Sequence, residues 1–512
     1  MEVLSTFNFL FISSILLLFL WMKHKYSYWE KRGVQCPYSH NYIFGHTKRL
    51  LLQKELFGVT YAKIYNCLKK KGLGFGGFYF FLKPIFLPVD LEIVKSIVQN
   101  EGNNFVDRGL YVNEEGDPIS TNLFNLEGKK WRHLRAKLTP TFTSGKMKMM
   151  FKILTDSANG LQKIMEEEQG KIVNVKDILA RFTTDVIGNC AFGLDCNCLE
   201  NPESLFRKHG KAIISRNFIQ NVKLLLILIF PELMKFLNTK IFSDDINDFM
   251  TKVVKDTVKY RESNNVTRND FMHLLIQLKN RGRLVDDGKL LDEGMSSKEN
   301  TITMDEVAAQ GFVFFTAGFE TSSSVMTFCL FELCQNKEIQ DKVRKEIKEI
   351  LGKYNGELSY EAVMDMTYME KVIKETLRKY PPLPHLDRES TNDFKLPGTD
   401  VTLEKGTKIA ISLIALHNDP DYFPNPEVFD PERFSEENVN SIPDFAYIPF
   451  GNGPRVCIGK RFGMMQTKVG LARLLQNFEF KLSPKTALPV EYDSSTFFLS
   501  VKGDIWLVPR KL

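Results

Sequence analysis

The chain has 512 residues, of which 43% are hydrophobic and 25% are charged, and its formal net charge is +6. This composition is ordinary for a globular protein, and a charge this small for the length gives no case for a nucleic-acid partner. We find no internal repeat and no low-complexity tract, which argues against a repeat architecture.

The first predicted element is a membrane-spanning helix at residues 3–22. This stretch contains no charged residue and would span about 30 Å as a helix. Glu2 precedes it and basic residues follow between positions 23 and 32, which is the reverse of the charge pattern of a cleaved signal peptide. The positive-inside rule keeps the basic flank in the cytosol. We therefore expect a retained single-pass signal anchor, a hinge over residues 23–45 and a cytoplasmic body over residues 46–512.

The body is predicted to be mainly α with small β-sheets near both ends. Residues 75–89 are aromatic and β-branched with two prolines, which predicts a short hairpin. Apolar residues at three- and four-residue intervals predict helices around residues 129–137, 146–168, 174–192, 203–221, 243–261 and 303–335.

The remaining segments predict loops and short strands. Residues 282–300 are polar and glycine-rich, which is typical of a surface loop. From residue 393 onward we expect short strands and turns, with one more helix after Gly459. Chain length alone would suggest two or more domains. Because nothing between residues 91 and 390 looks like an interdomain linker, we expect residues 46–512 to form a single catalytic domain.

The most informative motif is FGNGPRVCIG at residues 450–459. A cysteine thiolate is a strong, soft metal ligand, and the glycines around Cys457 let the backbone pass close to a flat ligand and turn amide groups toward the sulfur. Arg455 could reach an anionic group on the same ligand. The spacing F-x-x-G-x-R-x-C-x-G would arise by chance in about one of ten thousand chains of this length. We therefore interpret Cys457 as a ligand of a metal-containing cofactor.

This loop resembles the haem-binding loop of the cytochrome P-450 superfamily, in which the cysteine is the proximal thiolate of the haem iron. The resemblance implies the fold of that family and haem b (iron protoporphyrin IX) as the cofactor. It implies that Cys457 is the axial ligand of the iron, that Phe450 packs against the thiolate, and that Gly451 belongs to the turn against the cofactor. It also implies that Arg455 pairs with a haem propionate.

A second motif is E-T-L-R at residues 375–378, inside an amphipathic helical run. Glu375 and Arg378 share one helix face, but surface pairs of this kind are common and contribute under about 1 kcal/mol. In the family that the chain resembles, an arginine from a downstream motif joins the pair, and P-E-R-F at residues 431–434 supplies Arg433. The resemblance therefore implies a buried network of these three side chains that holds the loop of Cys457 in place.

A third motif lies within the helix predicted at residues 303–335, which Thr303 and Glu306 begin as a capping box. Long buried helices usually serve only to hold a core together. Here Glu320 and Thr321 place an acid and a hydroxyl where an apolar helix should avoid them. In the resembled family such an acid–alcohol pair lies beside a dioxygen groove and delivers protons, so the resemblance implies that both residues are catalytic.

Several further cationic residues suit a dianionic cofactor. Trp131 and Arg135 lie one helical turn apart, and the resemblance implies that they contact a haem propionate, as do Arg388 and Arg108. Each arginine read singly would more often be a surface residue. Basic residues that the resemblance places on the thiolate side, where an acidic electron donor would dock, are Lys129, Lys130, Arg132, Lys137, Lys460 and Arg461.

The chain also resembles the insect xenobiotic-metabolising microsomal branch of this family, in the stretches FVDRG, LTPTFTSGKMK, AGFETSS and ETLRKYPPLP. The resemblance implies a monooxygenase of the endoplasmic reticulum membrane that inserts one oxygen atom from dioxygen into lipophilic xenobiotics such as plant toxins or insecticides. It implies electrons from NADPH through NADPH–cytochrome reductase, and cytochrome b5 as a second partner. The implied pocket-lining segments are residues 113–124, 216–220, 311–315, 383–386 and 495–499, where His385 departs from the usual apolar residue.

Alternatives of other classes remain open on the sequence alone. A biosynthetic hydroxylase of an endogenous steroid, terpenoid or fatty acid would use the same residues. A haem-thiolate isomerase would tolerate loss of Thr321. A thiolate-haem gas or redox sensor needs Cys457 but neither the acid–alcohol pair nor an electron donor.

Overall fold

The computed structural model describes residues 2–215, 217–282, 285–286, 289–290 and 301–512. Most of the segment for which we predict a surface loop, residues 282–300, lies outside these ranges. Two short paired strands, β4 (Val285–Asp286) and β5 (Lys289–Leu290), are described within it.

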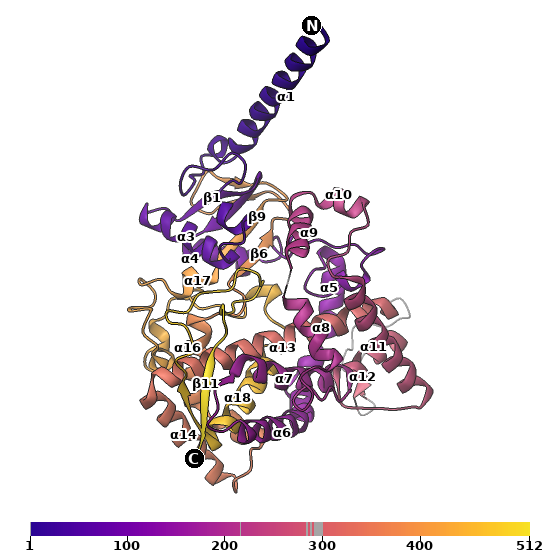
Figure 1. Cartoon of the computed structure of the whole chain (residues 1–512), viewed down its shortest axis with the longest axis vertical. Coiled ribbons are helices and arrows are strands. Elements are labelled where there is room, and N and C mark those ends of the chain that lie inside the picture. Colours follow the sequence, from indigo (N-terminus) through magenta and orange to yellow (C-terminus); the bar gives the residue numbers. More distant parts are fainter. Residues whose placement is uncertain (1, 216, 283–284, 287–288, 291–300) are drawn as a thin grey trace.

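The expectation of a mainly helical protein with small sheets is confirmed (Figure 1). The α-helices are α1 (Glu2–Tyr26), α2 (Lys48–Leu51), α3 (Phe57–Lys70), α4 (Leu91–Lys95), α5 (Gly128–Leu138), α6 (Ser144–Glu167), α7 (Val175–Ile187), α8 (Leu205–Ile214), α9 (Phe218–Ile229), α10 (Pro231–Phe236), α11 (Asp244–Ser263), α12 (Phe271–Arg281), α13 (Met304–Gln335), α14 (Lys337–Lys353), α15 (Tyr360–Asp365), α16 (Thr367–Lys379), α17 (Leu413–His417) and α18 (Lys460–Asn477). The other strands are β1 (Phe75–Phe80), β2 (Lys83–Pro88), β3 (Val173–Asn174), β6 (His385–Glu389), β7 (Phe394–Lys395), β8 (Thr402–Leu403), β9 (Lys408–Ser412), β10 (Phe478–Leu482) and β11 (Trp506–Lys511).

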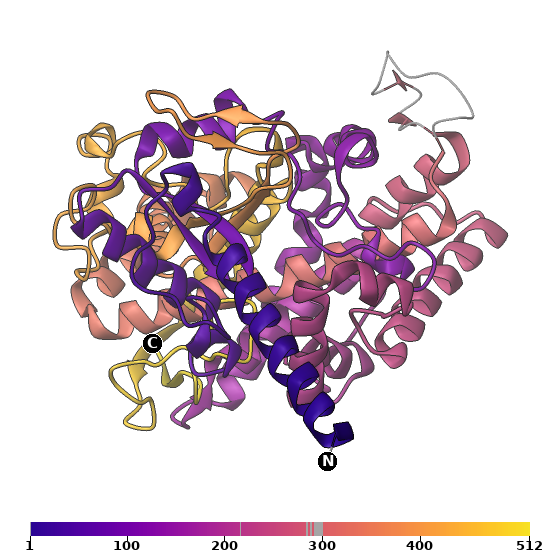
Figure 2. The same ribbon diagram turned by 90° about the horizontal axis from the view of Figure 1, so that it is seen from above.

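The largest sheet has the strand order β1-β2-β9-β6. Strands β1 and β2 pair antiparallel around Phe80 and Lys83, which confirms the predicted hairpin. Strand β9 then joins β2 in parallel and β6 in antiparallel orientation. Figure 2 shows these indigo and orange strands on one side of the body and the magenta helices α8–α12 on the other.

Helix α13 crosses the middle of the body (Figure 1) and packs against α7, α11 and α18. Its predicted start is confirmed, because the Glu306 amide donates to Thr303 Oγ1 at 3.1 Å and the Thr303 amide donates to Glu306 Oε2 at 2.7 Å. Its side chains are buried along most of its length. The helix therefore carries residues 317–322 through the interior of the protein.

Two of the predicted helical runs are interrupted. The run at residues 203–221 is divided, since α8 ends at Ile214 and Asn217 forms a new capping box with Gln220 that starts α9. The run at residues 174–192 ends in a π-helical turn, Gly188–Phe192. The periodicity of apolar residues continues across both breaks, so it did not reveal them.

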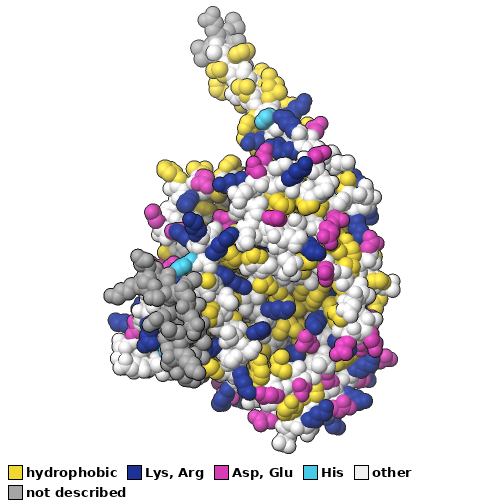
Figure 3. Space-filling view, turned by 180° about the vertical axis from the view of Figure 1, so that it is seen from behind, with side chains coloured by type: hydrophobic (Ala, Val, Ile, Leu, Met, Phe, Trp, Pro, Cys, Tyr) yellow, Lys and Arg dark blue, Asp and Glu magenta, His cyan; other side chains and the backbone are white. Residues whose placement is uncertain are grey.

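Helix α1 projects from the body (Figure 1) and belongs to a stretch, Thr6–Arg32, that is long and apolar enough to cross a membrane. Hydrophobic side chains cover its described part, whereas both signs of charge are interspersed over the body (Figure 3). Part of the segment predicted as a hinge packs on the first sheet, because Trp29 is 1% exposed and its Nε1 donates to the Phe78 carbonyl at 3.1 Å.

Candidate functional site

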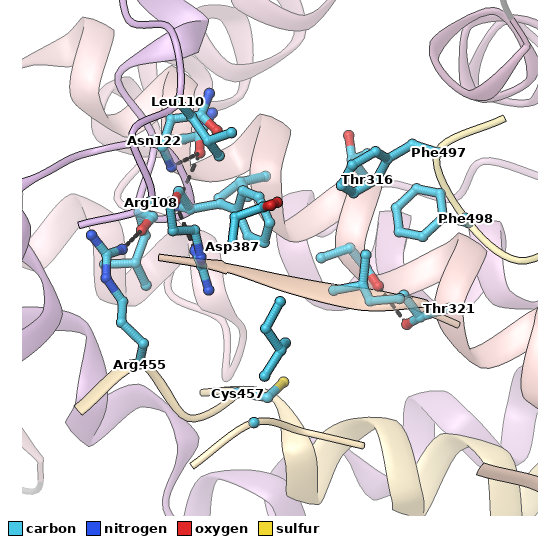
Figure 4. A pocket seen from close by; sticks show the side chains of 18 of the residues that line it. Arg108, Leu110, Asn122, Thr316, Thr321, Asp387, Arg455, Cys457, Phe497 and Phe498 are labelled. Atoms are coloured by element: carbon cyan, nitrogen blue, oxygen red, sulfur yellow. Dashed lines mark hydrogen bonds between the residues drawn. The ribbon is translucent and has the colours of Figure 1, made fainter. Parts of the chain in front are cut away.

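A cavity of about 1090 Å³ lies between α13, β6, α5 and the loop at residues 450–459. Its lining includes nine of the residues predicted for catalysis or cofactor binding: Arg108, Trp131, Arg135, Thr321, Arg388, Phe450, Gly451, Arg455 and Cys457. Figure 4 shows Cys457 and Thr321 facing this space from different elements, with Arg108 and Arg455 on the opposite side from Thr321. Elements that are far apart in the sequence therefore form one site.

The loop that carries Cys457 is folded back on itself. The Cys457 amide donates to the Phe450 carbonyl at 2.9 Å, and the Gly451 amide donates to the Ile448 carbonyl at 2.9 Å. Gly451 and Gly453 have φ values of 68° and 66°, a region that glycine occupies without strain. A Cβ on Gly453 would lie 1.8 Å from the Val98 carbonyl oxygen. The glycine at this position therefore permits a close backbone contact as well as the turn.

The Cys457 thiol is exposed to the cavity while protein surrounds it on the other sides. Burial raises the pKa of this thiol above its usual value, and the Gly459 amide, Arg135, Arg108 and Lys460 offset part of that rise. Gly459 is the N-cap residue of α18, where the helix dipole favours a negative charge. These donors and charges would stabilise a thiolate at the floor of the cavity.

Arg455 is buried and its guanidinium is held by three backbone carbonyls, those of Val106, Leu123 and Leu126. Its Cζ lies 4.0 Å from the centroid of the Trp131 ring, a cation–π distance. Burial lowers the pKa of Arg455 to about 9. A buried guanidinium of this kind gains from an anionic partner in the cavity.

The other three arginines also reach the cavity wall with carbonyl partners. Arg108 donates to the Phe124 carbonyl at 2.7 Å, and Arg388 donates to the Asp387 carbonyl at 2.8 Å. Arg135 donates to the Val456 carbonyl at 2.9 Å, next to the thiol. Burial lowers the pKa of all three. Four cations and a thiol around an apolar cavity fit a flat metal complex with two carboxylates, the chemistry expected of haem.

The acid and the alcohol of α13 face different surroundings. Thr321 lines the cavity, and its hydroxyl donates to the Ala317 carbonyl at 2.8 Å (Figure 4). Glu320 is 4% exposed, does not line the cavity, and pairs with Lys176 of α7 at 2.9 Å. Burial lowers the pKa of Lys176, and Glu320 opposes that shift. Lys176 was missed by sequence reasoning, because nothing in the sequence pairs it with a residue so far along the chain.

The structure brings Glu375, Arg378 and Arg433 together outside the cavity lining. Arg378 contacts both carboxylate oxygens of Glu375, at 2.7 and 2.8 Å, and both side chains are fully buried. Arg433 Nε lies 3.4 Å from Glu375 Oε1. The remaining donors of Arg378 reach the carbonyls of His417 and Pro426.

His417, also missed by sequence reasoning, connects this network to the loop of Cys457. The Ile448 amide donates to His417 Nε2 at 3.1 Å, and the Ile448 carbonyl accepts from the Gly451 amide. Burial lowers the pKa of His417 to about 3, so its ring is neutral and can accept at Nε2. A continuous path of hydrogen bonds thus runs from Arg378 to the turn before Cys457.

The pocket-lining segments predicted from the resemblance all contribute to the cavity, with Leu123, Gln220, Phe312, His385 and Phe497 among their members. Residue 216, at the start of one of these segments, lies outside the described residues. Asp387 also lines the cavity and was not singled out from the sequence. Residues two apart share one face of a strand. The sequence would therefore have indicated that Asp387 faces the cavity only if His385 were already known to face it.

Comparisons with known proteins agree with this arrangement. The family model for cytochrome P-450 matches residues 40–508. The chain is 42% identical over 500 residues to cytochrome P-450 6a2 of Drosophila melanogaster, covering 96% of this chain and 97% of that protein. It is also 42% identical over 490 residues to cytochrome P-450 6a9 of the same organism, covering 94% of each.

Proposed function

This chain belongs to the cytochrome P-450 family and is a monooxygenase, and on that premise we propose that it inserts one oxygen atom of dioxygen into lipophilic xenobiotics such as plant toxins and insecticides. The observation that carries this proposal is that the Cys457 thiol and the Thr321 hydroxyl face the same cavity, whose wall carries many aromatic side chains. Such a wall suits flat or bulky apolar compounds. A biosynthetic hydroxylase would share these features, and a spectral binding screen of insecticides against steroids distinguishes the two.

The family cofactor is haem, and the residues present fit it. Cys457 would hold the iron, Phe450 and Gly451 would lie against the ring, and Arg108, Arg135, Arg388, Arg455 and Trp131 would hold the two propionates. When bound, haem supplies an iron centre that activates dioxygen. The protein's own contribution is to place an amide and three cations where they favour the thiolate, to exclude bulk water and to bind the substrate.

Proton delivery falls to α13. Thr321 presents the hydroxyl at the cavity wall, and Glu320 lies next to it on the side of Lys176. We propose that Thr321 positions the proton that dioxygen reduction consumes and that Glu320 replenishes it from the Lys176 side. Because Glu320 does not line the cavity, it would act through the neighbouring hydroxyl or through water.

Thr321→Ala is expected to uncouple NADPH consumption from product formation. Removing the hydroxyl removes a positioned proton donor, so the share of NADPH recovered as product should fall by up to about 100-fold, the lower end of general acid contributions. The measurement is product formed per NADPH consumed in the presence of the reductase.

The matched control for this prediction is Thr316→Ala. Thr316 lies on the same helix, lines the same cavity and donates to the Phe312 carbonyl at 3.0 Å. This variant is expected to remain coupled. Equal coupling in the wild type and Thr321→Ala would remove the proton-delivery role.

For the electron donor we propose NADPH–cytochrome reductase, with cytochrome b5 as a second partner, docking on the basic side chains at the thiolate end. Lys129, Lys130, Arg132, Lys460 and Arg461 are exposed there, and an acidic partner would be steered to them. Lys137 is 3% exposed. It is therefore not part of this docking surface, contrary to the expectation from the sequence.

We further propose that Thr6–Arg32 anchors the protein in the endoplasmic reticulum membrane with the body in the cytosol. Deleting residues 2–26 is expected to release the protein from carbonate-washed microsomes, because about 20 apolar residues provide the span. The measurement is the share of protein that sediments with the membranes after the wash. The full chain is the control, and retention of the truncated chain would place the anchor elsewhere.

A further inference from the structure

Strand β6 presents a row of charged and polar side chains to the cavity. His385, Asp387 and Glu389 alternate with Leu386 and Arg388, so the first three lie on one face of the strand. On the neighbouring strand β9, Lys408 is opposite Glu389 in the antiparallel register. All of these acidic and basic side chains line the cavity.

The two carboxylates of this row differ in how they are neutralised. Glu389 is in a short ion pair with Lys408, whose Nζ also donates to the Gly109 carbonyl at 2.7 Å. Asp387 has one ion pair within the described ranges, to His385 Nε2 at 3.4 Å, which is longer than a normal charge-assisted hydrogen bond. The Asp387 side chain is 31% exposed to the cavity. Its carboxylate therefore has capacity for a donor from the cavity.

Asp387 is ionised at neutral pH. Burial raises the pKa of its carboxyl, but His385, Arg108 and Arg388 together bring it below the usual value. The two arginines have carbonyl partners of their own, and both are candidates to bind the carboxylates of the cofactor. They are thus not free to serve as donors for Asp387 once those carboxylates are in place.

Aromatic rings surround the histidine of this pair. The His385 ring is stacked against Phe57 at 6.1 Å, and Tyr61 and Phe497 approach it edge-on at 4.9 and 5.9 Å. Its Nδ1 is buried without a hydrogen-bond partner among the described residues. The ring is therefore fixed by packing, and Phe57, Tyr61 and Phe497 line the same cavity as Asp387. Burial raises the pKa of Tyr61 and the charge of Asp387 raises it further, so this ring lies within reach of the carboxylate's field. A cavity that offers both a carboxylate and aromatic rings suits an organic ammonium group.

We propose that Asp387 is a substrate-binding residue that accepts a hydrogen bond from the protonated amine of a lipophilic substrate, whose apolar body lies against the neighbouring rings. This inference rests on the proposed function and makes its substrate class more specific. The site selects lipophilic amines over hydrocarbons of the same shape, because only the amine brings a charged donor to the part of the Asp387 carboxylate that faces the cavity.

The test compares two probes that differ only at one atom. Phenylbutyl-dimethylamine is protonated at neutral pH, and its isostere carries an isopropyl group in place of the dimethylamino group. The dissociation constant of each is measured by calorimetry on the full-length, haem-loaded protein, for the wild type and for Asp387→Asn. Glu389→Gln is the matched control, since it removes a carboxylate from the same strand face that Lys408 already neutralises.

Asp387→Asn is expected to weaken binding of the amine by about tenfold, the loss of one charged contact, and to leave binding of the hydrocarbon unchanged. Glu389→Gln is expected to preserve the difference between the probes. Equal weakening of both probes would overturn the inference, since the amine would then not bind through Asp387. A Soret band that the amine shifts to the red in wild type and variant alike would also overturn it, since the amine would then bind on the iron. The carbon monoxide spectrum of the same samples reports separately on the proposed function. A spectrum without the thiolate-type band would refute the haem-thiolate site. An intact spectrum, together with an amine affinity that Asp387→Asn leaves unchanged, would refute only the role of Asp387.

Discussion

Glu375→Ala is expected to destabilise the fold by about 3–5 kcal/mol, because the substitution leaves a buried guanidinium without its carboxylate. Arg378 is fully buried and contacts both oxygens of Glu375. The Asp430 amide also donates to Glu375 Oε1 at 3.0 Å and would lose its acceptor. The first measurement is the midpoint of urea unfolding of the full chain in detergent. The second is the haem content of the purified protein, and this content should fall because His417 links the network to the loop of Cys457.

Glu349→Ala provides the matched control for that result. Glu349 pairs with Lys345 one helical turn away on α14, but both side chains are largely exposed and the contact is 3.9 Å long. Its removal should cost under about 1 kcal/mol. Similar unfolding midpoints for the two variants would mean that the buried network does not stabilise the fold.

Cys457→Ala is expected to abolish haem binding through sulfur while leaving the fold intact. The thiol faces the cavity and is not part of the hydrophobic core, so its removal creates no buried void. The expected result is complete loss of the thiolate-type absorbance, with unchanged far-ultraviolet circular dichroism. Cys36→Ala, which removes a partly buried thiol outside the cavity lining, should retain the absorbance. A Cys457→Ala protein with wild-type absorbance would assign the iron ligand to another residue.

Features that depend on neighbouring residues could be predicted from the sequence. The capping box of Thr303 and Glu306 fixed the start of α13 because both partners lie within one turn. The loop at residues 450–459 was recognisable because its glycines, arginine and cysteine lie within ten consecutive residues. The close contact between the Val98 carbonyl and the backbone of Gly453 was not predicted, because Val98 belongs to a segment far away in the sequence.

Features that depend on long-range packing could not be predicted in this way. The ion pair of Glu320 with Lys176 joins two helices separated by more than a hundred residues, and neither residue carries a local sign of the other. The separation of Glu320 from the cavity follows from the rotation of α13 against α7, which packing sets. Likewise, the lowering of the Asp387 pKa depends in part on Arg108, which comes from a segment far away in the sequence.

The most direct test of the central claim is the carbon monoxide difference spectrum of the purified wild-type protein after reduction with dithionite. A Soret maximum at about 450 nm is the result that a thiolate bound to haem iron predicts. No band at that position in correctly folded, haem-reconstituted protein would contradict the assignment of Cys457 as the iron ligand and, with it, the proposed chemistry of the cavity.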